Sequence, residues 1–188
     1  MKSIKSIGLM LVAALAFNVS FAQSMSDEKT VEVGGAPMYP SKNIVENAVN
    51  SKDHTTLVAA VKAAGLVETL QTAGPFTVFA PTNSAFGMLP TGTVETLVKP
   101  ENKAKLTGIL TYHVVAGRLG SNELDELIKK GKGTTELTTV AGGKLWVMKK
   151  GGTYMLKDEN GGMANITIKN VYQSNGVIHV IDHVVLPK

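Results

Sequence analysis

The chain of 188 residues contains no cysteine. This absence excludes disulfide bonds, a thiolate nucleophile, a lipid-anchored N-terminal cysteine, and zinc–thiolate or iron–sulfur sites. Arginine is nearly absent as well, since Arg118 is the only one, and guanidinium groups are the best suited to recognise phosphates and base edges. The fold must therefore be held together by packing, without covalent cross-links.

An excess of charge of one sign is also missing. The net charge is +4 at pH 7, and it falls to +2 if Lys2 and Lys5 are removed with the N-terminal segment described next. So small an excess, carried almost entirely by lysine, does not favour binding to a phosphate backbone. We expect no nucleic-acid partner.

Residues 1–22 have the three parts of a secretory signal peptide. Two lysines are followed by an uncharged apolar run at residues 7–17, and the small residues Ser20 and Ala22 suit the −3 and −1 positions of a cleavage site. The apolar run is about half the length of a membrane-spanning helix, and no other long apolar run follows. The sequence predicts cleavage after Ala22, a secreted or periplasmic protein, and no transmembrane anchor.

The remaining 166 residues suffice for one well-buried core. Residues 23–38 are polar, contain Gly34-Gly35 and Pro37, and show no periodicity, which predicts a flexible leader. Residues 39–188 are predicted to form one domain.

Helical patterns dominate the first part of this domain and short strands the second. Helices are predicted at about 44–49, 57–64, 83–88, 93–98, 100–112 and 121–128, and strands at 76–80, 134–140, 144–149, 153–157, 166–172 and 177–186. Asn175-Gly176 is a strong signal for a tight hairpin. Helices followed by an antiparallel meander, with one early strand, predict an α+β fold.

The histidines do not indicate a metal site. His179 and His183 lie in a run of β-branched residues, and four steps along a strand span about 13 Å, too far for two imidazoles to share an ion easily. The glycine pairs match neither Walker nor dinucleotide spacing and are typical of turns. The sequence predicts no metal and no cofactor.

Asp182 is the single acid in this apolar run, so its carboxylate must be paired or hydrogen-bonded. Such a group is compatible with an active site, and Ser84, His113 and Asp182 supply the residue types of a hydrolytic triad. However, no Gly-x-Ser-x-Gly elbow surrounds any serine. A polar network that fixes the last strand is the favoured interpretation, and a hydrolase the least favoured.

Three stretches together resemble one family. Gly74-Pro-Phe-Thr-Val-Phe-Ala-Pro-Thr-Asn-Ser-Ala-Phe86, Tyr112-His-Val-Val115 and Asn175-Gly-Val-Ile-His-Val-Ile-Asp-His-Val-Val-Leu-Pro187 are similar, in order and spacing, to the motifs of the fasciclin (FAS1) domain. The resemblance covers about residues 38–188. It implies a β-sandwich or wedge of mainly antiparallel strands with helices packed on it.

The resemblance also implies a role in cell adhesion or extracellular interaction, with partner contacts around Tyr112 and His113. From the residues themselves we predict that Thr82, Asn83, His113 and Asp182 form one internal hydrogen-bonded cluster that joins the three motifs. In that case the motifs serve folding more than binding.

Three functions therefore remain open. The first is a secreted or periplasmic module without catalysis, which binds an extracellular or envelope protein, a polysaccharide or a second copy of itself. The second, also suggested by some members of the family, is a carrier of an apolar small molecule such as a carotenoid. The third is a hydrolase that uses Ser84 with His113.

Overall fold

A computed structural model describes residues 28–72 and 74–188. The predicted signal peptide and its cleavage site after Ala22 lie outside these residues. The strands are β1 Val31–Val33, β2 Ala36–Met38, β3 Phe76–Pro81, β4 Val114–Ala116, β5 Thr134–Thr138, β6 Lys144–Lys150, β7 Thr153–Lys157, β8 Met163–Gln173 and β9 Gly176–Ile181.

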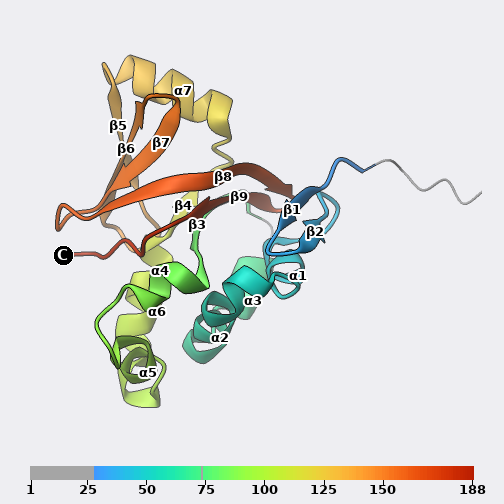
Figure 1. Ribbon diagram of the computed structural model, residues 1–188, viewed down its shortest axis with the longest axis vertical. Helices are drawn as coiled ribbons and strands as arrows, with labels where there is room; N and C mark the ends of the chain where they lie inside the picture. The colour runs from blue at the N-terminus through green and yellow to red at the C-terminus, as the bar shows by residue number, and fades with distance from the viewer. Residues whose placement is uncertain (1–27, 73) are drawn as a thin grey trace, which may run out of the picture.

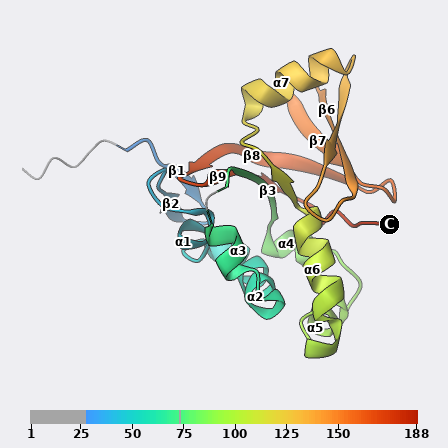
Figure 2. The ribbon, with the colours of Figure 1, turned by 180° about the vertical axis from the view of Figure 1, so that it is seen from behind.

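The helices are mostly short. They are α1 Ile44–Ala48, α2 Thr55–Ala64, α3 Val67–Gln71, α4 Asn83–Gly87, α5 Thr93–Leu97, α6 Lys103–Tyr112 and α7 Ser121–Lys130, with 3₁₀ turns η1 Lys52–His54 and η2 Pro100–Asn102. Helices α1 to α6 lie at one end of the molecule and α7 at the other, with β8 and β9 crossing between them (Figures 1 and 2). No helix in the described ranges is long and apolar enough to cross a membrane.

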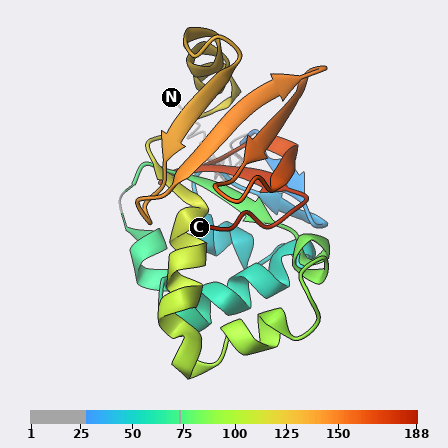
Figure 3. The same ribbon diagram turned by 90° about the vertical axis from the view of Figure 1, so that its left-hand side faces the viewer.

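Seven strands form one curved sheet in the order β4-β3-β9-β8-β7-β6-β5. All neighbours are antiparallel except β3 and β9, which run parallel at its centre. The two edges of the sheet meet through an isolated bridge between Val115 of β4 and Thr139, which directly follows β5, so the sheet curls round on itself. Figure 3 shows the meander β5–β8 standing over the helical end. The predicted α+β wedge is confirmed.

Alternate residues of the central strands serve two cores, because side chains on a strand point alternately to its two faces. Val78 and Ala80 of β3 face helices α1, α2 and α6, whereas Phe79 faces the meander and α7. This double burial explains why the sequences of β3 and β9 are apolar at almost every position.

The pairing of β3 with β9 brings the first and third motifs side by side. Phe76 lies opposite Gly176, and a Cβ on Gly176 would come within 2.2 Å of the Phe76 carbonyl oxygen, so only glycine fits there. The predicted hairpin joins β8 to β9 through Ser174 and Asn175. The last predicted strand, at 177–186, ends earlier than expected, at Ile181, and residues 182–188 continue as irregular chain.

The predicted leader is wrong for residues 31–38. These residues form the β1–β2 hairpin, and Val33 and Met38 are 1% and 2% exposed in the core beneath the helices. Gly34 makes the turn in the left-handed region and its carbonyl accepts a hydrogen bond from Lys52 N–H. The ordered domain therefore begins before residue 39.

Candidate functional site

Tyr112 is the last residue of α6 and is completely buried. Its hydroxyl donates to the Lys144 carbonyl (2.6 Å) and accepts from the Glu159 N–H (3.2 Å). Burial raises the pKa of Tyr112 to about 12. This side chain thus connects the end of the helical layer to the start of β6 and to the turn after β7.

His113 follows directly and is also buried, with 3% exposure. Nδ1 lies 2.8 Å from the Ile109 carbonyl and must donate to it, whereas Nε2 accepts from Val185 N–H at 3.2 Å. The neutral ring alone satisfies both contacts, and burial lowers the pKa of His113 to about 4. Both side chains are therefore buried and bonded to main-chain groups, and His113 also lines the groove described below.

Asp182 is bonded at a different place. Its carboxylate accepts from Asn165 N–H (2.7 Å) and Asn165 Nδ2 (2.8 Å), and it contacts Nδ1 of His183 at 2.9 Å. Partial burial works against the charged form, but these hydrogen bonds outweigh it and lower the pKa of Asp182. Asp182 fixes the chain after β9 to β8.

The polar residues at the start of α4 complete the predicted set. Thr82 is the N-cap of α4, because its side chain accepts a hydrogen bond from Ala85 N–H. Asn83 instead accepts from Thr56 N–H and donates to the Lys52 carbonyl, which holds the start of α2.

The predicted single cluster is therefore wrong. No hydrogen bond in the described ranges joins Thr82, Asn83, His113 and Asp182 to one another; each fixes its own neighbouring segment of main chain. The three motifs are held together by the parallel pairing of β3 with β9 and by the contact from Val185 to His113.

The same contacts argue against the hydrolytic triad. Ser84 lies exposed on α4, both ring nitrogens of His113 are occupied by main-chain groups, and Asp182 is bonded to Asn165 and His183. A triad needs the base within hydrogen-bond reach of both its nucleophile and its acid.

His179 is likewise a structural residue. It is completely buried on β9, its Nε2 donates to the Leu119 carbonyl at 2.7 Å, and burial lowers its pKa. His183 is exposed on the irregular chain beyond β9. Across residues 28–72 and 74–188, no group of three acidic or histidine side chains is arranged to hold a metal ion.

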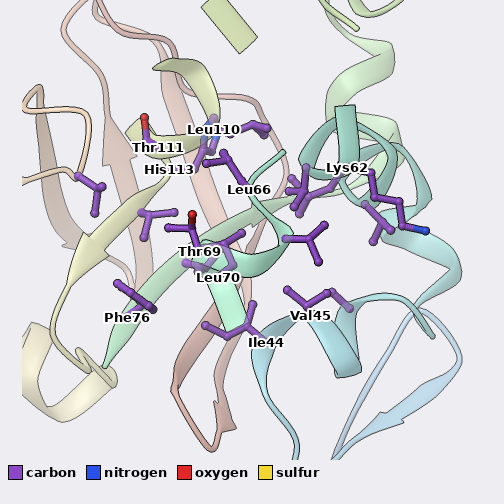
Figure 4. Close-up of a pocket in the computed structure, with 18 residues that line it drawn as sticks. Ile44, Val45, Lys62, Leu66, Thr69, Leu70, Phe76, Leu110, Thr111 and His113 are labelled. Carbon is purple, nitrogen blue, oxygen red and sulfur yellow. The ribbon is translucent and has the colours of Figure 1, made fainter. Parts of the chain in front are cut away.

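The largest apolar feature is a groove between the helices and the sheet (Figure 4). It encloses about 800 Å³ when its open mouth is included, but its cavity volume is only about 70 Å³. The groove is therefore narrow inside. Helices α1, α2 and α3 form one side and β3, β4 and the end of α6 the other. Its walls include Val45, Val58, Val61, Leu70, Phe76 and Val114.

A smaller cavity adjoins this groove, and both are lined by Ile44 and Leu57. The buried His54 lines this smaller cavity. Its Nε2 has no hydrogen-bond partner in the described residues, while its Nδ1 contacts Ser51 Oγ at 2.9 Å. Burial lowers the pKa of His54, although the nearby Ala80 carbonyl partly offsets this.

The sequence did not indicate this groove. The signal that could have found it lies in α2, where Val58 and Val61 are apolar positions beyond those that the core needs, namely Leu57, Ala60 and Ala64. An amphipathic helix with so wide an apolar surface is expected to contact more than one apolar surface.

Comparisons with known proteins agree with the motifs. The family model described as Fasciclin domain matches residues 52–187. Protein sll1483 of Synechocystis sp. is 45% identical over 169 residues, which are 90% of this chain and 87% of that protein. Immunogenic protein MPB70 of Mycobacterium bovis is 35% identical over 145 residues, which are 74% of this chain and 66% of that protein.

A solved structure of a FAS1 domain pair, from the insect cell adhesion molecule Fasciclin I, has the same fold. The TM-score is 0.69 at 17% identity, over 85% of this chain and 58% of that chain. The resemblance stated from the three motifs is thereby confirmed.

Proposed function

Because the chain belongs to the fasciclin domain family, we propose that it is a non-catalytic interaction module of the cell exterior. Its partner is an envelope or extracellular protein or polysaccharide. The proposal is supported by the related insect protein, which is named a cell adhesion molecule, and by the internal use of the polar residues that a hydrolase would need.

The observation that carries the proposal is the apolar groove of α1, α2 and α3. A surface groove lined by aliphatic side chains is typical of a binding site, because leaving it exposed to water is unfavourable. Its mouth is bordered by Lys62, Thr69 and Thr111, which are polar ends suited to the rim of a binding surface (Figure 4).

The test is capture of partners from the envelope and secreted fractions of the source organism by the purified mature protein. The variant Val58→Lys places a charge in the groove, and Val98→Lys places the same charge on a valine that is 37% exposed outside it. We expect Val58→Lys to lose the partners and Val98→Lys to retain them. Equal retention by both variants would refute the groove as the binding surface.

A second candidate, the carrier of an apolar small molecule, is favoured by the same groove and by the adjoining cavity at His54. The mainly apolar wall suits a molecule such as a carotenoid, but its narrow interior requires α1 or α3 to move outward first. Organic extraction of protein purified from its own host, followed by absorbance and mass spectrometry, separates the two candidates. A stoichiometric apolar ligand supports the carrier.

A function at the cell exterior requires that the protein is exported from the cytoplasm, and residues 1–22 are the predicted export signal. Fractionation of cells and N-terminal sequencing of the mature protein test this point. A first residue at Gln23, in the periplasm or medium, is the expected result.

A further inference from the structure

The outer face of the meander carries an open hollow around Trp146, the only tryptophan of the chain. Along β6, Leu145 and Val147 point into the core, so Trp146 and Met148 point outward. In the register of the sheet, Trp146 lies between Glu136 on β5 and Lys157 on β7. The indole thus forms part of the floor of a concave surface rather than of the core.

The turn after β7 forms one wall of this hollow and is held firmly. Asp158 accepts from the N–H groups of Asn160, Gly162 and Leu186, at 2.7–3.0 Å. Tyr112 accepts from Glu159 N–H beneath it. A wall braced from below in this way keeps its shape without a ligand, as most small-molecule sites do.

Several polar atoms of the hollow remain available. Trp146 Nε1, Lys157 Nζ and Thr134 Oγ1 make no hydrogen bond to any residue in the described ranges, and Asn160 uses Nδ2 but not its amide oxygen. Donors and an acceptor therefore surround a flat aromatic surface.

The composition of the hollow decides between classes of ligand. Lys157 is outnumbered by Asp158 and Glu159, which disfavours phosphates and nucleic acids. The polar wall does not suit a wholly apolar ligand, and the charges around Trp146 are those depleted from the centres of protein interfaces. A neutral sugar fits, because a pyranose ring offers an apolar C–H face to the indole and hydroxyls to the groups at its edge.

We propose that this hollow binds a neutral polysaccharide, with Trp146 as the stacking residue and Lys157 and Asn160 as hydrogen-bonding residues. The volume of the hollow is about 500 Å³, which is in the range of small-ligand sites. Because it is open, a chain is bound along its length rather than at its end. The inference rests on the proposed function and names the class of its partner, at a surface separate from the groove.

The single tryptophan makes the test direct. Chitotetraose, cellotetraose, laminaritetraose and maltotetraose are titrated into the mature protein while its tryptophan fluorescence is recorded. At least one is expected to give a saturable change below about 10 mM, the weak affinity usual for a small open site. Isothermal titration calorimetry then compares the variants, since Trp146→Ala has no tryptophan signal.

Trp146→Ala is expected to weaken binding at least about tenfold and Trp146→Phe less, because phenylalanine retains an aromatic face. Tyr172→Ala, which removes an aromatic side chain that is 39% exposed elsewhere on β8, serves as the matched control and is expected to bind as the wild type does. Circular dichroism verifies that each variant is folded.

Two results would overturn the inference: no saturable change with any of the four sugars, or unchanged affinity in Trp146→Ala. The capture experiment described above is run in parallel. If envelope partners are still captured while no sugar binds, the polysaccharide inference is wrong and the proposed function stands. If neither is observed, both are wrong.

Discussion

Acidification is predicted to destabilise this protein through its buried histidines well before its carboxylates become protonated. Burial lowers the pKa of His113 to about 4, and it lowers those of His54 and His179 in the same direction. In the unfolded chain each ring titrates near 6.5. Between these values the unfolded state therefore binds more protons than the folded state, and the free energy of unfolding rises with pH.

The magnitude follows from the shift at His113. A difference of 2.5 pKa units, from 6.5 to about 4, corresponds to about 3 kcal/mol of stability that is present above pH 7 and lost by about pH 4. Between about pH 7 and pH 5 this histidine alone accounts for about 2 kcal/mol. The pKa of Asp182 is lowered, so its contribution is present above its unfolded pKa and is lost only below this window.

The measurement is urea denaturation followed by circular dichroism at about pH 7, 6 and 5, with linear extrapolation to water. His113→Asn is expected to be less stable at neutral pH but to have a flatter dependence on pH. A wild-type slope of zero, or one that His113→Asn leaves unchanged, would refute the reasoning.

If His113→Asn does not fold, the wild type still provides the answer. The ring resonances of His113 in an NMR titration should show no protonation down to about pH 5. A midpoint near 6.5 would mean that the ring reaches water and that the contact from Val185 does not hold it neutral.

Three further substitutions test the separate roles of the polar residues. Tyr112→Phe leaves the Lys144 carbonyl and the Glu159 N–H without their partner and should cost about 1–3 kcal/mol of unfolding free energy in urea. Asp182→Asn should lower the melting temperature at pH 7, by removing a charged acceptor worth about 1 kcal/mol, and this difference from the wild type should shrink as the pH falls through the lowered pKa of the carboxylate. Thr82→Ala removes the cap of α4 and should cost about 1 kcal/mol, whereas the exposed Ser84→Ala should be neutral in the same melts.

The sequence predicted the strands well because their signals are local. Phe76–Pro81 is apolar except for Thr77 and follows Pro75, and the turns of the meander carry glycine pairs. The hairpin at residues 31–38 was missed because it has only three residues on each strand, and its burial comes from Val33 and Met38 alone. Its stability depends on a distant core that no local window contains.

The polar residues show a different limit. The sequence indicates that Thr82, Asn83, His113 and Asp182 need hydrogen-bond partners. It shows the type of each side chain but not the distances between these side chains in the fold. Together they are satisfied largely by main-chain groups close to them in space, such as the N–H of Val185 for His113. Main-chain donors and acceptors occur at every position and leave no mark in the sequence, so such pairings cannot be predicted from residue types.

Tyr112 nevertheless relates the family motif to the proposed sugar site. Tyr112 and His113 are buried, and the hydroxyl of Tyr112 supports both Lys144 at the start of β6 and Glu159 in the turn after β7. Trp146 lies two residues after Lys144, and Asn160 directly follows Glu159. A change at Tyr112 would therefore alter the spacing of floor and wall and weaken binding without touching the ligand. A buried group can act on the proposed site in this way because a wall on irregular chain keeps its shape only if the residues beneath hold it.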